Sequence, residues 1–160
     1  TSREAHLLHD SKRVRVPTPT VYEVDVATCT IIMDYLNGPR LKEALFGMED
    51  SELSRTCRHV GSLVGQLHSG GIVHGDLTTS NMILRDGDKL FFIDFGLSGY
   101  SNEPEARGVD LLLMNRAFKS THFALHSRAF ESVVDGYRRV RGRKEPFRQV
   151  QASAEGLGRS

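Results

Sequence analysis

Three polar residues, Asp76, Asn81 and Asp94, have the types and the order that a phosphoryl-transfer site needs. Asp76 and Asn81 lie five residues apart in one loop, and Asp94 follows a short apolar run. A carboxylate at position 76 could orient an attacking hydroxyl group and accept its proton. The amide oxygen of Asn81 and the carboxylate of Asp94 are hard oxygen ligands, which suit Mg²⁺. The sequence therefore predicts a site that holds a magnesium ion and phosphate groups beside an acceptor.

These residues lie in two motifs that together match the catalytic signature of protein kinases. Residues 73–81 read V-H-G-D-L-T-T-S-N, and residues 93–96 read I-D-F-G. The kinase signature places an Asn after the catalytic-loop Asp and follows both with a D-F-G. The match predicts ATP and Mg²⁺ as cofactors and Asp76 as the catalytic residue, while Gly96 lets the chain turn sharply after Asp94. The alternative is a turn Asp, a turn Asn and a helix-capping Asp that share no site.

The neighbours of Asp76 argue against a protein kinase that is switched by phosphorylation. The usual H-R-D carries an arginine that pairs with a phosphorylated activation loop, and Gly75 has no side chain to do so. The segment from Gly96 to Val109 is short and contains no A-P-E. We expect His74 to brace the backbone near the D-F-G rather than to act as an acid or base. The other histidines show no metal-ligand spacing and are expected to be surface or packing residues: His6, His9, His59, His68, His122 and His126.

The length and composition fit one domain that can bury a core. The 160 residues carry a formal net charge of +1, which by itself implies neither a nucleic-acid nor a membrane partner. The chain has no apolar run long enough to cross a bilayer and no signal peptide, so we expect a cytoplasmic and/or nuclear protein without membrane contact. It begins with Thr1 rather than Met, which is consistent with a fragment. Cys29 and Cys57 lie in apolar settings and are expected to be buried free thiols.

The pattern of apolar residues predicts an α+β chain. β-branched and aromatic residues at 20–24 and 30–35 predict one hairpin. A second hairpin is expected at 82–84 and 90–93, across a D-G-D turn, and it would fold Asn81 and Asp94 toward one another. Helices are expected at 2–13, at 41–46, from an Asp50 or Ser51 cap to Gly70-Gly71, at 109–118 and around 130–137.

Three helical segments carry the predicted core. The helix after residue 50 has one apolar face with alternating spacings of four and three residues. Residues 111–114 are apolar all round, which predicts a central buried helix. The chain becomes polar after Val140 and is expected to fray. The two apolar faces comprise Leu53, Cys57, Val60, Val64 and Leu67 in the first helix, and Phe130, Val133, Val134 and Tyr137 in the last.

Residues 73–81, 93–98 and 108–111 resemble the small atypical kinase subunit of the KEOPS (EKC) complex. The T-T-S insert in the catalytic loop is the most specific part, because other H-G-D phosphotransferases carry different residues there. The resemblance covers most of the chain and implies a protein-kinase-like C-lobe, mainly helical with short β-hairpins, and a truncated N-lobe. Residues 1–140 would form this domain from helix C, a remnant N-lobe hairpin and the C-lobe. Residues 141–160 would form a flexible tail, first basic and then polar.

The same resemblance implies a function. The chain would be an ATP-dependent phosphotransferase or ATPase that supports threonylcarbamoyladenosine modification of tRNA, with serine/threonine kinase activity. Its partners would be other KEOPS subunits, tRNA and a protein substrate. Glu4 would be the helix-C Glu that pairs with the strand-3 Lys at the nucleotide, and Asp110 would brace the catalytic loop. From the residues alone, Glu4 could be a solvated helix residue and Asp110 a helix N-terminal carboxylate stabilised by the helix dipole.

The chain also departs from the family pattern. It contains no G-x-G-x-x-G and no V-A-I-K, so the glycine loop over the phosphates and the strand-3 Lys are not in this sequence. The resemblance assigns the basic residues Arg141, Arg143 and Lys144 to tRNA binding, whereas a solvated helix end is the alternative. Two other functions stay open: a small-molecule phosphotransferase of the aminoglycoside type, which also uses H-G-D, and a non-catalytic kinase-like binding module.

Overall fold

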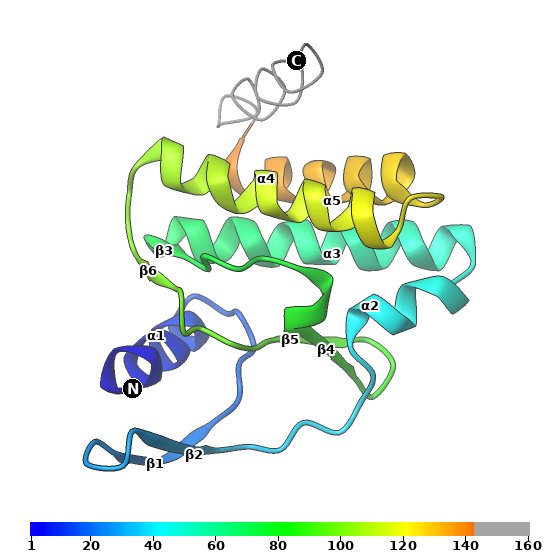
Figure 1. Cartoon of the computed structure of the whole chain (residues 1–160). Helices are drawn as coiled ribbons and strands as arrows, with labels where there is room; N and C mark the ends of the chain where they lie inside the picture. The colour runs from blue at the N-terminus through cyan, green and yellow to red at the C-terminus, as the bar shows by residue number, and fades with distance from the viewer. Residues whose placement is uncertain (143–160) are drawn as a thin grey trace.

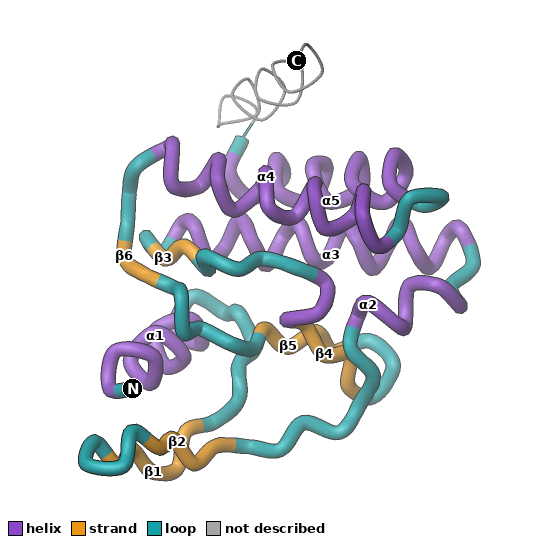
Figure 2. The backbone as a smooth tube through the Cα atoms, in the orientation of Figure 1, coloured by secondary structure: helices purple, strands orange, loops and turns teal. Residues whose placement is uncertain are grey.

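The long helices and the small sheets occupy different parts of the molecule. The computed structural model describes residues 1–142. The elements in chain order are α1 (Ser2–Arg13), β1 (Val21–Asp25), β2 (Thr30–Met33), α2 (Leu41–Ala44), the 3-10 turn η1 (Leu45–Gly47), α3 (Asp50–Ser69), β3 (Ile72–Val73), the 3-10 turn η2 (Thr79–Asn81), β4 (Met82–Arg85), β5 (Lys89–Phe92), β6 (Gly99–Tyr100), α4 (Pro104–Thr121) and α5 (His126–Arg141). Helices α3, α4 and α5 lie together at one end and the β1–β2 hairpin at the other, with α1 and β4–β5 between them (Figures 1 and 2). The expected α+β class is confirmed.

Helix α3 buries the apolar face that the sequence predicts. The five members of that face are each at most 1% exposed: Leu53, Cys57, Val60, Val64 and Leu67. The predicted cap was wrong, because Glu49 occupies the N-cap position and makes no side-chain cap hydrogen bond. Asp50 and Ser51 instead lie inside the first turn, where a carboxylate interacts favourably with the helix dipole.

Helices α3 and α5 lie side by side with their backbones in close contact. A β-carbon on Gly61 would lie 1.8 Å from the main-chain oxygen of Val133, and one on Gly136 would lie 1.9 Å from that of Arg58. Both positions therefore require glycine. Next to these glycines, Nε of Arg58 donates to Oδ2 of Asp135 at 2.7 Å. The position of α5 is thus fixed against α3 by backbone contact rather than by adaptable side chains.

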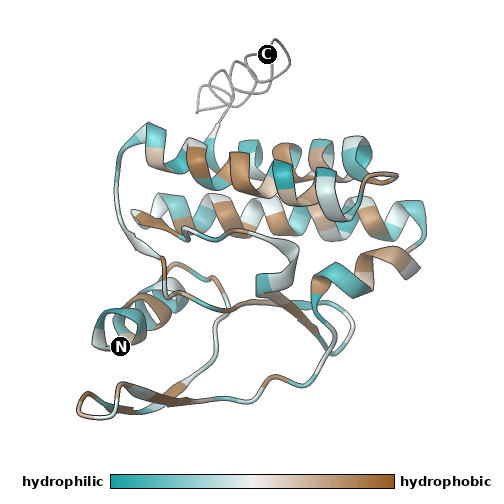
Figure 3. Cartoon of the chain, in the orientation of Figure 1, coloured by the Kyte–Doolittle hydropathy of each residue, from teal (hydrophilic) through white to brown (hydrophobic). Residues whose placement is uncertain are grey.

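Helix α4 is buried on one side only. Leu111, Met114 and Phe118 are fully buried, whereas Val109 is 54% exposed. The expectation of a helix buried all round was wrong, because α4 packs against α5, β3 and η2 and its remaining side lies at the surface. The hydropathy colouring shows hydrophobic segments on α3, α4 and the strands (Figure 3).

The β1–β2 hairpin is antiparallel and mostly exposed. Its two strands form a sheet of their own within residues 1–142, and Tyr22, Val26 and Ile32 are 67%, 65% and 50% exposed. Cys29 lies at its tip and is exposed, so the expectation of a buried thiol was wrong there. Cys57 is buried as expected, and desolvation raises the pKa of its thiol to about 12.

The β4–β5 hairpin matches the predicted one and aligns the two motifs. Its register pairs Met82 with Phe92 and Arg85 with Lys89. One residue beyond the strands, the Ile93 amide donates to the Asn81 carbonyl at 3.0 Å. The hairpin thereby places the end of the first motif beside the start of the second. None of the helices within residues 1–142 is long and apolar enough to cross a membrane.

Candidate active site

Asp76 and Asn81 are in direct contact. The side-chain amide nitrogen of Asn81 donates to the main-chain oxygen of Asp76 and to its Oδ2, each at 2.9 Å. Both residues lie in the loop between β3 and β4, with Asn81 buried and Asp76 half-buried. Because both amide hydrogens of Asn81 point to Asp76, its side-chain oxygen Oδ1 is the atom that faces other ligands.

Asp94 lies two residues beyond the end of β5. The Ile93–Asn81 backbone bond places it beside Asn81. Asp94 has a φ of +60° and an exposed carboxylate, and the Gly96 amide donates to its Oδ1 at 3.4 Å. Positive φ is uncommon outside glycine, although Asp adopts it more readily than most residues. The backbone thus places the residue before Asp94 next to Asn81, which itself contacts Asp76, whereas the convergence of the three side chains on one ion stays a prediction.

His74 links the two motifs through hydrogen bonds of its ring. Its Nδ1 accepts from the Asp76 amide at 3.2 Å, and its Nε2 lies 3.0 Å from the Ile93 carbonyl, to which it must donate. Burial lowers the pKa of His74, against the opposing effect of nearby carboxylates. The ring is therefore neutral at pH 7, with its proton on Nε2. The Ser98 hydroxyl also donates to the His74 carbonyl at 2.6 Å.

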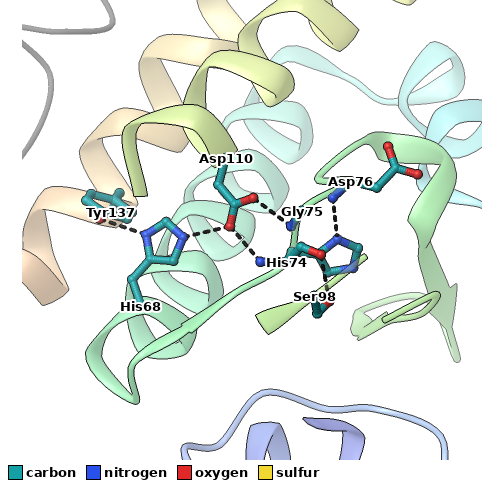
Figure 4. Close-up of polar contacts among 7 residues, drawn as sticks. All are labelled: His68, His74, Gly75, Asp76, Ser98, Asp110 and Tyr137. Atoms are coloured by element: carbon teal, nitrogen blue, oxygen red, sulfur yellow. Dashed lines mark hydrogen bonds and ion pairs between the residues drawn. The ribbon is translucent and has the colours of Figure 1, made fainter. Parts of the chain in front are cut away.

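Asp110 holds the start of the catalytic loop from helix α4 (Figure 4). Its Oδ2 accepts from the His74 amide at 2.7 Å, and its Oδ1 accepts from the Gly75 amide at 2.8 Å. Gly75 itself has a φ of +82°. Asp110 is only 1% exposed, so a side chain deep in the core fixes the backbone just before Asp76.

His68 is a buried residue with a polar role that its sequence position did not reveal. Its Nε2 lies 3.0 Å from Oδ2 of Asp110, and its Nδ1 lies 2.9 Å from the Tyr137 hydroxyl of α5. Its 1% exposure agrees with a packing residue, and in addition its ring bridges two polar groups. The available signal was its place in the last turn of the helix that leads into the catalytic loop, six residues before His74.

His122 was missed in the same way. Its Nε2 lies 3.0 Å from the hydroxyl of Thr79 in the catalytic loop. The ring is 1% exposed and packs against Phe46 and Phe118, with ring centroids 4.9 and 5.5 Å away. Burial lowers the pKa of His122, and Lys42 lowers it further. The end of α4 therefore contacts the loop at Thr79, in addition to the contacts that Asp110 makes at His74 and Gly75.

Two more of the predicted site residues lie on helices α1 and α5. Glu4 is half-buried in the first turn of α1. Arg141 lies at the end of α5, where its Nη1 donates to the Ser69 hydroxyl at 3.2 Å. Arg143 and Lys144 lie outside the described residues. Within residues 1–142, no group of three or more His, Cys, Asp or Glu side chains is arranged to hold a metal ion.

Comparisons with known proteins show the family to which this chain is related. A family model described as the RIO domain matches residues 1–128. The KEOPS complex subunit Bud32 of Pyrococcus abyssi is 51% identical over 142 residues, which are 89% of this chain and 64% of that subunit. A probable bifunctional tRNA threonylcarbamoyladenosine biosynthesis protein of Methanothermobacter thermautotrophicus is 42% identical over 140 residues, and that of Methanosarcina barkeri is 45% identical over 137 residues.

The chain spans only part of the length of these relatives. The match to the Methanothermobacter protein covers 88% of this chain but only 25% of that protein. The match to the Methanosarcina protein covers 86% of this chain but only 23% of that protein. The resemblance to the KEOPS kinase-like subunit is nevertheless confirmed over most of this chain. Because the family model matches 128 of its 160 residues, the chain belongs to the RIO-domain family.

Proposed function

We propose that this chain provides the nucleotide site of an ATP-dependent phosphotransferase or ATPase that supports threonylcarbamoyladenosine modification of tRNA as a KEOPS subunit. One observation supports this most: the Asn81 amide binds Asp76 while its backbone binds the residue before Asp94. The names of the relatives supply the biological context. In this proposal α1 is helix C, the β1–β2 hairpin belongs to the N-lobe, and α3 to α5 form the C-lobe.

Each residue of the site has a proposed role. Asp76 orients the attacking hydroxyl or water and accepts its proton, because it is the half-buried carboxylate at the centre of the loop. Oδ1 of Asn81 and the Asp94 carboxylate would hold Mg²⁺, which fits a metal that takes one or two protein oxygens and completes its shell with phosphates and water. When bound, the ion would neutralise phosphate charge. Glu4 would act at the nucleotide from helix C.

The supporting residues keep this site in one geometry. His74 ties the Asp76 amide to the Ile93 carbonyl, so it joins the two halves of the site. Asp110 fixes the loop backbone before Asp76. Gly96 lets the chain turn after Asp94. The basic residues from Arg141 onward would contact tRNA phosphates.

Magnesium-dependent ATP hydrolysis tests the proposal in the full-length protein with its partner subunits, with and without tRNA. Asp94→Asn should lower hydrolysis by at least about 100-fold, because a neutral amide is a weaker magnesium ligand and leaves phosphate charge unbalanced. Asp88→Asn is the matched control, since Asp88 is an exposed carboxylate on the β4–β5 turn. Normal hydrolysis by the Asp94 variant would overturn the assignment. ATP binding without hydrolysis in the wild type would assign a non-catalytic binding module instead.

The acceptor of the phosphoryl group needs a separate measurement. Labelled γ-phosphate recovered on serine or threonine of an added protein would establish kinase activity, whereas release as inorganic phosphate alone would establish an ATPase. Asp76→Asn should abolish both outcomes, because Asp76 would orient the attacking group in either case, a serine or threonine hydroxyl in a kinase and water in an ATPase.

A further inference from the structure

Two buried side chains extend the hydrogen-bond network of Asp110 away from the catalytic loop. His68 contacts Asp110, and Tyr137 contacts His68. We propose that they are positioning residues for the catalytic loop. Tyr137 sets which nitrogen of His68 carries the proton, and His68 then sets the orientation of the Asp110 carboxylate. The kinetic part of this inference rests on the proposed function, whereas its structural part does not.

The first step is the geometry of Asp110. Its two carboxylate oxygens together accept three hydrogen bonds, from the amides of His74 and Gly75 and from Nε2 of His68. The two amides belong to the loop whose position is to be explained, so they cannot by themselves define where the carboxylate lies relative to the helices. His68 belongs to α3 and supplies the contact from a rigid element (Figure 4).

The second step is the tautomer of His68. An aspartate carboxylate only accepts hydrogen bonds, so Nε2 of His68 must carry a proton. In the tautomer with its single proton on Nε2, Nδ1 is an acceptor, and the Tyr137 hydroxyl at 2.9 Å can donate to it. Without that hydroxyl, the opposite tautomer would place a lone pair on Nε2 against the carboxylate 3.0 Å away. Outer hydrogen-bond partners commonly fix histidine tautomers in this manner.

The third step is burial. His68 and Asp110 are 1% exposed and Tyr137 is fully buried. The His68 and Tyr137 rings also pack edge to face, with centroids 5.5 Å apart. Water therefore has little access to this network. Removing one of its hydrogen bonds leaves a buried polar group without a hydrogen-bond partner.

The fourth step connects the network to α5. Tyr137 is the neighbour of Gly136, at which α5 touches the backbone of α3. This backbone contact fixes the distance between the Tyr137 hydroxyl and His68. The orientation of the catalytic loop therefore depends on how α5 packs against α3, although α5 contributes no residue to the proposed nucleotide site.

The experiment uses the full-length protein and compares Tyr137→Phe, His68→Leu and His68→Gln with the wild type. Phenylalanine keeps the ring and removes one oxygen, whereas glutamine keeps one donor and one acceptor. Thr18→Val is the matched control, because Thr18 is equally buried and its hydroxyl donates to the Leu8 carbonyl at 2.7 Å, outside the loop. Three quantities are measured: the ¹⁵N shifts of the His68 ring, amide hydrogen exchange at His74 and Gly75, and kcat and KM for ATP.

We expect the wild-type ring to carry its proton on Nε2 only. Tyr137→Phe and His68→Leu should accelerate amide exchange at His74 and Gly75 and lower kcat about tenfold, the lower end of outer-partner effects, with KM changed less than about twofold. His68→Gln should restore most of kcat, and Thr18→Val should alter neither kcat nor these two amides. A wild-type ring protonated on Nδ1, or unchanged exchange in Tyr137→Phe, would overturn the positioning role. Absence of ATP hydrolysis in the wild type would overturn only the proposed function, because the ring shifts and amide exchange still decide the positioning role.

Discussion

A β-carbon on Gly75 would lie 2.2 Å from the main-chain oxygen of Leu97, so these two residues pack backbone against backbone. The segment after the D-F-G motif thus covers the position at which many kinases carry the arginine of H-R-D. The sequence showed only that Gly75 cannot bind a phosphorylated loop. The structure adds that the side chain is excluded by both φ and space.

Gly75→Ala should therefore destabilise the protein strongly. Left-handed backbone costs about 1 kcal/mol for an L-residue, and the clash with Leu97 adds about 1–3 kcal/mol. Urea denaturation measures the loss in the free energy of unfolding. Gly87→Ala should lose only the stability that the left-handed backbone costs, because Gly87 has a φ of +84° and no atom lies near its would-be β-carbon. Gly47→Ala should leave the free energy of unfolding nearly unchanged, because its φ is not positive and its surroundings are open. Equal losses at Gly75 and Gly87 would show that the Leu97 contact is unimportant.

His74 gives a prediction for pH. Burial lowers the pKa of its ring below the ordinary value of 6.5, although Asp110, Asp76 and Asp94 oppose this shift. The unfolded chain therefore binds a proton at a higher pH than the folded chain does. Stability should be full above about pH 6.5 and should fall as the pH drops below it. Urea denaturation from pH 7.5 to 5 measures this slope.

The His74→Gln variant separates this residue from the other histidines. Burial also lowers the pKa of His59, His122 and His126. The variant should therefore keep part of the dependence of its unfolding free energy on pH and lose the part that His74 contributes. An NMR titration of the ring in the wild type is the direct check. A slope that is the same in wild type and variant would show that His74 does not titrate during unfolding.

Thr79→Val should weaken the contact between the catalytic loop and the end of α4. The variant removes the hydroxyl that lies 3.0 Å from Nε2 of buried His122. A buried polar group left without its partner costs about 1–3 kcal/mol, which thermal or urea unfolding would detect. Thr78→Val is the control, since it changes the adjacent, half-buried threonine. If both variants lose the same stability, the contact with His122 contributes nothing specific.

Arg141 at the end of α5 and the basic residues Arg143 and Lys144 should act together in tRNA binding. Replacing Arg141, Arg143 and Lys144 with Ala should lower affinity and flatten the salt dependence of log K by up to about three units, one for each lost phosphate contact. Fluorescence anisotropy over a salt series measures both in the complete complex. Arg139→Ala is the control, because Arg139 pairs with Asp135 at 3.1 Å. An unchanged salt slope in the triple variant would leave this segment as a solvated helix end.

Local chemistry made much of the fold predictable. The four-and-three spacing located the buried face of α3, and the Asp86-Gly87-Asp88 turn located the β4–β5 hairpin. That hairpin was enough to predict that the chain before Asp94 lies next to Asn81, as the Ile93–Asn81 backbone bond shows. The exposed side of α4 was not predictable in the same way, because apolar residues 111–114 look alike in sequence whether or not a partner covers them.

The hydrogen-bond network of Asp110, His68 and Tyr137 could not be predicted from the local sequence pattern. His68 and Asp110 are 42 residues apart, and His68 and Tyr137 are 69 apart. Their contact depends on how α3, α4 and α5 pack, and that packing rests on glycine contacts between helices. Asp110 was recognised only through a family resemblance, and Cys29 was misjudged because an apolar neighbourhood in sequence became an exposed hairpin tip.

The β1–β2 hairpin has a practical consequence for anyone who handles this chain. Within residues 1–142 each of its strands pairs only with the other, so both outer edges offer unpaired backbone groups. Open edges of this kind are templates for further strands, and the exposed Tyr22, Val26 and Ile32 would add apolar contact. A preparation of residues 1–142 should therefore scatter more light as it is concentrated, and charged replacements at these side chains should keep it clear.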